Sequence, residues 1–94
     1  MKDMFKEAMK LQARLMEELR QIKVEGSAGG GMVRVEMDGE QNVTSVKIEP
    51  QVYADHDPAM LEDLIRAAFN DARKKIMEKT QESFKNITGL PAGL

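Results

Sequence analysis

One stretch, GSAGGGMVRVEMDG, which runs from Gly26 to Gly39, decides the plan of the chain. Its second half alternates between apolar and polar side chains, with Val33, Val35 and Met37 on one side, which is the period of a half-buried strand. Its first half holds three consecutive glycines, and each glycine destabilises a helix interior by roughly 1 kcal/mol. We therefore predict a strand that is entered through a glycine-mediated reversal or bulge.

Two further strands complete a small antiparallel sheet over about residues 24–49. The first, over residues 24–28, has a weak signal because it contains Gly26. An Asp38-Gly39 turn leads into a return strand over residues 43–48, and Pro50 ends that strand because proline cannot donate to the ladder. We expect Thr44, Val46 and Ile48 on one face of the return strand, and Val43, Ser45 and Lys47 on the other.

The residues before the sheet predict a long amphipathic helix from about Asp3 to Lys23. Its apolar stripe is wider than a coiled-coil seam and includes Met1, Met4, Ala8, Leu11, Leu15 and Ile22. Four basic residues recur at four-residue spacing and therefore share another face: Lys2, Lys6, Lys10 and Arg14. On the residues alone, a solvated surface is the favoured explanation of this basic face, and a ridge that contacts phosphates is the alternative.

A second helix is predicted over about residues 58–88, after a connecting loop over residues 51–57. Asp57 is suited to the N-cap of this helix, Pro58 to its first position and Gly89 to its C-cap. We expect residues 89–94 to form a loose tail. The helix contains a basic cluster that fans around its axis: Arg73, Lys74, Lys75 and Lys79. Favourable charge near the negative end of the helix and a second phosphate-contacting surface are compatible explanations of this cluster.

The lengths of the two helices favour a dimer. The second helix would span about 46 Å and the first about 30 Å, whereas a compact chain of this size has a radius of gyration of about 12 Å. Helices of that length must project from a small sheet, and their apolar stripes need a partner. We therefore expect one domain over residues 1–94 that forms a homodimer, whose second copy pairs or covers the sheet edges.

Composition excludes several classes of protein. The chain of 94 residues has no cysteine, a net charge of −2 and an isoelectric point near 5.4. With neither an apolar signal region nor a membrane-length apolar run, we expect a soluble protein of the reducing cytoplasm. Basic residues outnumber acidic ones by six to five in residues 1–25 and again in residues 58–94, whereas residues 26–57 hold two basic and six acidic residues.

The sequence contains no catalytic or metal-binding constellation. The one histidine, His56, lies between Asp55 and Asp57, and these three neighbours are better explained as a polar loop that ends in a helix cap than as metal ligands. Thr80 and Ser83 have no base at a motif spacing. We therefore predict a protein that is not an enzyme and uses no cofactor, metal ion or small-molecule substrate.

Five segments taken together resemble the YbaB/EbfC family of small bacterial nucleoid-associated proteins. The most specific are Met60–Ala72 (MLEDLIRAAFNDA) and Gly89-Leu90-Pro91. The others are Met9–Gln12, Gly26–Val33 and Val46–Pro50. The resemblance extends over essentially the whole chain, in order and without an insertion.

The resemblance implies an α+β fold, namely an α-β-β-β-α protomer in a tweezer-like homodimer. It also implies a protein of the nucleoid that binds double-stranded DNA with little sequence preference, organises the nucleoid and influences gene expression. The projecting helices would contact the DNA, through Lys2, Lys6, Lys10, Arg14, Arg73, Lys74, Lys75 and Lys79. Asn70 and Asp71 would serve packing or capping. The alternative is a dimeric adaptor whose methionine-rich helices bind a replication or recombination factor.

Overall fold

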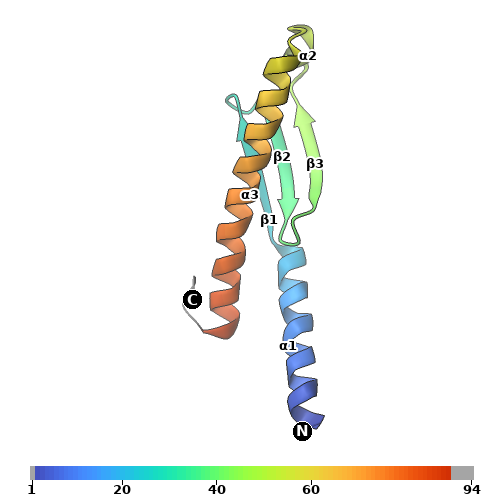
Figure 1. The fold of residues 1–94 in the computed structure, drawn as a ribbon, viewed down its shortest axis with the longest axis vertical. Coiled ribbons are helices and arrows are strands. Elements are labelled where there is room, and N and C mark those ends of the chain that lie inside the picture. The colour runs from blue at the N-terminus through green and yellow to red at the C-terminus, as the bar shows by residue number, and fades with distance from the viewer. Residues whose placement is uncertain (1, 90–94) are drawn as a thin grey trace.

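The computed structural model describes residues 2–89 (Figure 1). Its elements are, in order, α1 (Lys2–Gln21), β1 (Lys23–Ala28), β2 (Val33–Asp38), β3 (Val43–Ile48), α2 (Pro50–Ala54) and α3 (Pro58–Thr88). The predicted order of a helix, three antiparallel strands and a long final helix is confirmed. The predicted tail beyond Gly89 lies outside the described residues.

Two predicted boundaries differ from the structure. The first helix ends at Gln21 rather than near Lys23, because Lys23 already pairs with Asp38 in the sheet. The prediction of a loop over residues 51–57 is wrong for its first part, which forms α2. Pro50 occupies the first turn of this short helix, and Val52, only 2% exposed, provides the burial that holds it against the domain.

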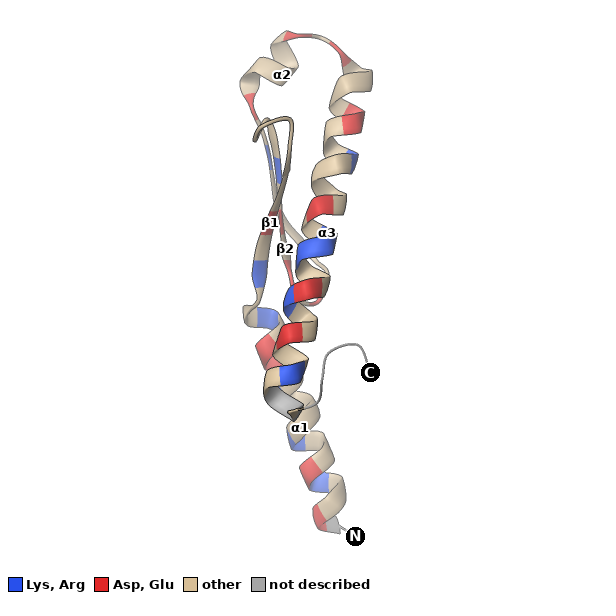
Figure 2. Ribbon diagram, turned by 90° about the vertical axis from the view of Figure 1, so that its left-hand side faces the viewer, with Lys and Arg blue, Asp and Glu red and all other residues tan. Residues whose placement is uncertain are grey.

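Alternation along β2 places its apolar side chains in the core, as predicted. The sheet has the order β1-β2-β3, and both pairs of strands are antiparallel. Val33, Val35 and Met37 are each at most 1% exposed and pack against α3. The polar residues between them face the other side of the sheet, which no helix of the described residues covers in Figure 2.

A β-bulge between β2 and β3 changes which side chains of β3 share a face. Glu36 pairs with Ser45 but Met37 pairs with Val43, so Thr44 is an extra residue on β3. Val43 therefore lies on the face of Met37, and its predicted place beside Ser45 is wrong. The hydroxyl of Thr44 donates to Glu36 Oε1 at 3.1 Å, so the prediction that Thr44 shares a face with Val46 is wrong as well.

α3 lies unusually close to β1 because both elements present small residues. A Cβ on Gly26 would overlap backbone atoms of Ala68 and Ala72 on the helix, and both alanines are fully buried. α3 packs mainly on β1 and β2 (Figure 1). β3 is left largely uncovered, with Val43 42% and Val46 51% exposed.

Both ends of α3 have the predicted caps. The Asp57 side chain accepts a hydrogen bond from the Met60 N–H at 3.1 Å, and Pro58 begins the helix. Gly89 adopts a left-handed conformation with φ 73°, and its N–H donates to Lys85 O at 2.8 Å. Both predicted caps are therefore confirmed.

The described chain is elongated, with dimensions of 63 × 22 × 16 Å and a radius of gyration of 17.7 Å. α1 and the C-terminal half of α3 extend beyond the same end of the sheet (Figure 1), as their lengths predict. In the part of the chain that the structure describes, neither of these helices combines the length and apolar character of a membrane span.

Candidate nucleic-acid interface

The basic face of α1 is free to meet a ligand. Lys6, Lys10 and Arg14 are exposed on the projecting part of the helix, and their four-residue spacing places them along one side of it. Among residues 2–89, no side-chain hydrogen bond or ion pair engages any of the three. The side chain of Lys2, the fourth predicted member of this face, lies outside the described residues.

The basic residues of α3 do not form one surface. Successive residues of a helix are about 100° apart, and the buried Ile76 marks the side that faces the sheet. Arg73 lies on the β2 side of α3, where it lines a small pocket with Met37 and Phe69. Lys75 and Lys79 lie on the β1 side, and the exposed Lys74 lies on the outer face. The structure therefore separates the predicted cluster into three directions.

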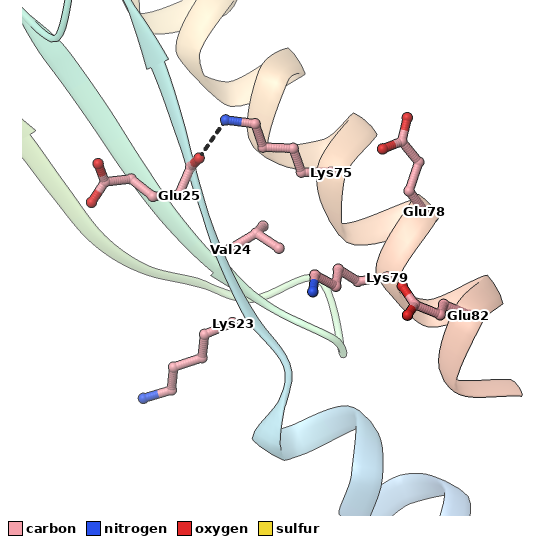
Figure 3. Close-up of a pocket in the computed structure, with 7 residues that line it drawn as sticks. All are labelled: Lys23, Val24, Glu25, Lys75, Glu78, Lys79 and Glu82. Atoms are coloured by element: carbon pink, nitrogen blue, oxygen red, sulfur yellow. Dashed lines mark hydrogen bonds between the residues drawn. The ribbon is translucent and has the colours of Figure 1, made fainter. Parts of the chain in front are cut away.

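Lys75 has a structural role within the protein. Its Nζ donates to Glu25 O at 2.9 Å (Figure 3). The same Nζ lies 3.1 Å from Asp71 Oδ2. Asp71 Oδ2 in turn accepts a hydrogen bond from the Ser27 N–H at 3.0 Å. The side chains of Asp71 and Lys75 on α3 thus form hydrogen bonds with backbone groups of the edge strand β1 that face away from β2. The packing role predicted for Asp71 is confirmed.

The local environment holds Asp71 in its charged form. The hydrogen bond from the Ser27 backbone lowers the pKa of Asp71, and the hydrogen bond from Lys75 lowers it further. An ionised Asp71 accepts both hydrogen bonds, so α3 and β1 are held together by charge-assisted contacts.

A groove of about 340 Å³ lies between β1 and α3, lined by Lys23, Val24, Glu25, Lys75, Glu78, Lys79 and Glu82. Figure 3 shows Lys79 extending from α3 towards β1 beside Val24, whereas Lys23 and Glu25 point away to the other side of the sheet. Three lysines and three glutamates line the groove, so it offers no excess of positive charge. The groove is therefore a poor site for a polyanion, and Lys79 is a weaker candidate than the α1 residues.

One further basic residue belongs with the candidates. Lys85 is exposed and lies eleven residues after Lys74, which brings it to nearly the same angle around α3. The basic cluster in the sequence extends to Lys85. The buried Ile76 shows which side of α3 faces the sheet, and this places Lys85 on the outer face with Lys74, not on the side of Lys75. Acidic and basic residues are interspersed along both helices in Figure 2.

The exposed cations on two projecting helices suit contacts with phosphates. The protein has no tryptophan, one tyrosine and three phenylalanines, so stacking on bases offers little. Within residues 2–89, no group of three or more His, Cys, Asp or Glu residues could hold a metal ion. The chemistry available at this surface is charge neutralisation and hydrogen bonding by Lys and Arg.

Comparison with known proteins places this arrangement in a family. Residues 1–90 match the model of the YbaB/EbfC DNA-binding family. A nucleoid-associated protein of Legionella pneumophila is 46% identical over 89 residues, which cover 92% of this chain and 79% of that protein. A nucleoid-associated protein of Gluconacetobacter diazotrophicus is 43% identical over 97% of this chain and 91% of its own length.

A solved structure supports the fold independently. The crystal structure of an uncharacterised protein from Helicobacter pylori superposes with a TM-score of 0.76 at 21% identity, over 90% of this chain and 89% of that one. At this level of identity the likeness concerns the fold. The family match over residues 1–90 and the relatives at 46% and 43% identity lead to one conclusion: the chain belongs to the YbaB/EbfC DNA-binding family.

Proposed function

We propose that the protein is a nucleoid-associated protein that binds double-stranded DNA through phosphate contacts, with low sequence specificity. The observation that supports this most directly is the exposed row of Lys6, Lys10 and Arg14, which have no partners in the described chain. Family membership and the names of the relatives agree with DNA as the ligand. The protein acts in the nucleoid of a bacterial cell, without a cofactor and not as an enzyme.

Binding would follow the physics of counterion release. Each lysine or arginine that neutralises a phosphate releases a condensed cation, so the affinity falls steeply with salt. Lys74 and Lys85 on the outer face of α3 supply further contacts, and Arg73 and Lys79 weaker ones. Because phosphates carry no sequence information, such a protein organises DNA broadly and influences the expression of many genes.

The functional unit is a homodimer. α3 leaves β3 uncovered, so Val43 and Val46 on the sheet, and Ile65 and Phe69 on the helix, are between 38% and 51% exposed. A second copy of the chain could bury these side chains under its own apolar surface, which would contribute about 25 cal/mol for each Å² of apolar area covered. Two copies joined in this way would present four projecting helices to DNA in a tweezer-like arrangement.

An adaptor for a protein partner, such as a replication or recombination factor, is the second candidate. It is favoured by three large apolar side chains on α1, where Met4 is 76%, Phe5 67% and Met9 56% exposed. Flexible methionines suit a surface that adapts to a partner. On this alternative, the apolar stripe of α1 is the active face, and its basic residues only keep the helix soluble.

A mobility-shift titration at several salt concentrations separates the two candidates. The triple variant Lys6→Glu/Lys10→Glu/Arg14→Glu should abolish the shift of duplex DNA while the dimer stays folded. The pair Lys6→Glu/Lys10→Glu has a charge-matched control in Lys47→Glu/Arg66→Glu, which changes two exposed cations elsewhere. If the triple variant shifts DNA normally, the α1 site is wrong, and if the parent protein binds no duplex at micromolar concentration, the adaptor is favoured.

A further inference from the structure

α1 is held by the rest of the protein only near its C-terminal end. Residues 3–14 are all exposed, and partial burial begins at Leu15 and continues at Met16 and Leu19. Figure 1 shows the helix leaving the sheet at the β2–β3 turn, residues 39–42, and projecting away from it. A helix supported at one end takes its direction from the contacts at that end, and α1 makes these with α3 as well as with β2 and the turn that follows it.

The β2–β3 turn supplies the hydrogen bonds that end α1. The Gly39 N–H donates to both Leu19 O and Ile22 O at 3.0 Å. The last carbonyl groups of a helix have no partner within the helix itself, so this single donor from another part of the chain serves as its cap. The cap ties the end of α1 to the sheet through backbone atoms alone.

Gly39 is required here by space. A Cβ at this position would overlap the carbonyl oxygen of Leu19 and lie 2.9 Å from the carbonyl carbon. These are backbone atoms of α1, so no side chain could rotate to make room. Any larger residue at position 39 must therefore push the end of α1 away from the turn.

The turn itself is braced. Asp38 Oδ1 accepts hydrogen bonds from the N–H groups of Glu40 at 2.9 Å and Asn42 at 3.0 Å. The Asp38 N–H donates to Asn42 O at 3.0 Å. The position of Gly39 is thus fixed relative to the strands, which makes the turn a rigid support.

A second contact joins the end of α1 to the same turn. Arg20 Nε donates to Glu40 Oε1 at 3.1 Å, with side chains that are 60% and 29% exposed. Such an exposed pair adds little to stability. The pair joins the residue after Gly39 to the residue after Leu19, so it is a second point of attachment beside the cap.

We propose that the β2–β3 turn sets the angle of α1, and that Gly39 and Glu40 are positioning residues for the DNA contacts of Lys6, Lys10 and Arg14. This inference rests on the proposed function, since it names what aims the binding helix. The thirteen residues between Lys6 and Leu19 span about 20 Å of helix, so a tilt of about 10° at the turn moves Lys6 by about 3 Å. A displacement of that size is comparable to the length of a hydrogen bond to a phosphate.

The angle can be measured without DNA. The chain has no cysteine, so Gln12→Cys and Gln81→Cys, both at exposed positions of α1 and α3, accept a pair of nitroxide labels. Double electron–electron resonance on labelled protein diluted with unlabelled protein then reports the distance within one chain. We expect one narrow distance distribution in the parent, and a shifted or broadened one, by several Å, in Gly39→Ala.

Three further variants keep the test independent of folding defects. Glu40→Arg places like charges beside each other on the surface and should broaden the distribution, and adding Arg20→Glu should narrow it again. Gly30→Ala is the control for backbone strain away from α1: its φ of 69° strains an alanine, but the added Cβ meets no atom within 4 Å, so the distance should stay unchanged. Circular dichroism checks that the sheet and α3 are retained.

Each outcome is decisive. If Gly39→Ala and Glu40→Arg both keep the parent distribution, the turn does not set the angle. If Gly39→Ala moves α1 but binds duplex DNA as tightly as the parent, rather than about tenfold more weakly, its positioning role is wrong. If the parent binds no DNA, the proposed function fails, whereas the distance measurements still decide whether the turn controls α1.

Discussion

Asp71 on α3 accepts a hydrogen bond from the backbone N–H of Ser27 on β1 at 3.0 Å, across 44 positions of the sequence. The same carboxylate pairs with Lys75, which donates to the neighbouring backbone carbonyl of Glu25. A helix that packs on the face of the sheet thereby also closes part of its edge.

Removing Asp71 should loosen this edge. Asp71→Ala leaves the Ser27 N–H without its acceptor and the Lys75 ammonium without its ion pair, so we expect the free energy of unfolding to fall by about 1 kcal/mol, since the site is partly exposed. Urea denaturation measures the change. Asp63→Ala removes an exposed carboxylate whose one polar partner within residues 2–89 is Arg66, so it should change the stability much less. Equal losses would contradict a special role for Asp71.

The same carboxylate should make the stability depend on acid. Its pKa is lowered in the folded protein from an ordinary value of 3.8, so its contribution is complete above that value and is lost as the pH falls through the lower folded pKa. The difference in free energy of unfolding between the parent and Asp71→Asn should therefore be constant near neutral pH and narrow below about pH 4. A difference that grows on acidification would contradict this assignment.

The close approach of α3 to β1 should tolerate no side chain at position 26. Gly26→Ala would place a methyl group on the backbone of Ala68 and Ala72, and we expect a loss of about 3 kcal/mol, typical of severe overpacking. Thermal or urea unfolding compares this variant with Gly30→Ala, whose added Cβ meets open space and which should lose only about 1 kcal/mol, from the strain of its left-handed φ of 69°. Similar losses in the two variants would mean that helix packing does not depend on Gly26.

The salt dependence of DNA affinity should distinguish basic side chains that bind DNA from those that stabilise the fold. Replacing Lys6, Lys10 or Arg14 by alanine should each reduce the slope of log affinity against log salt by about 0.9. Lys75→Ala should leave the slope unchanged and lower the stability instead, because its ammonium already binds Glu25 O and Asp71. Filter-binding titrations at four salt concentrations measure the slopes.

A charge on the uncovered strand should disrupt the proposed dimer. Val46 is half exposed in one chain, so Val46→Glu should leave the protomer folded while it prevents burial of β3 against a second copy. Sedimentation velocity should show a monomer for Val46→Glu and a dimer for Lys47→Glu, which changes the opposite face of the same strand. A dimeric Val46→Glu would place the interface elsewhere.

The local pattern predicts the elements well and the long-range contacts poorly. Alternation in Val33, Val35 and Met37 fixes the buried face of β2, and Asp57, Pro58 and Gly89 mark both ends of α3, because each signal arises from neighbouring residues. The bulge that moves Val43 to the other face depends on which backbone groups pair across two strands. No periodicity within one strand contains that information.

The candidate site divides in the same way. The four-residue spacing on α1 identifies a shared basic face, since it depends on helix geometry alone. The distinction between Lys74 and Lys75 depends on how α3 rotates over β1. The Lys75 ammonium donates a hydrogen bond to the backbone carbonyl of Glu25, 50 positions away in the sequence. Its structural role could therefore be found only in the folded protein.

The closed edge of β1 also limits how copies of the chain can assemble. A sheet with two open edges can add strands head to tail without end, since each new copy offers the edge that the next one needs. Because Glu25 O and the Ser27 N–H are already bonded to α3, strand addition at these positions would break two hydrogen bonds, and β3 is the more open edge. Pairing of β3 with β3 of a second copy would use the open edges of both partners at once, so this route would favour a closed pair of chains over a growing fibre.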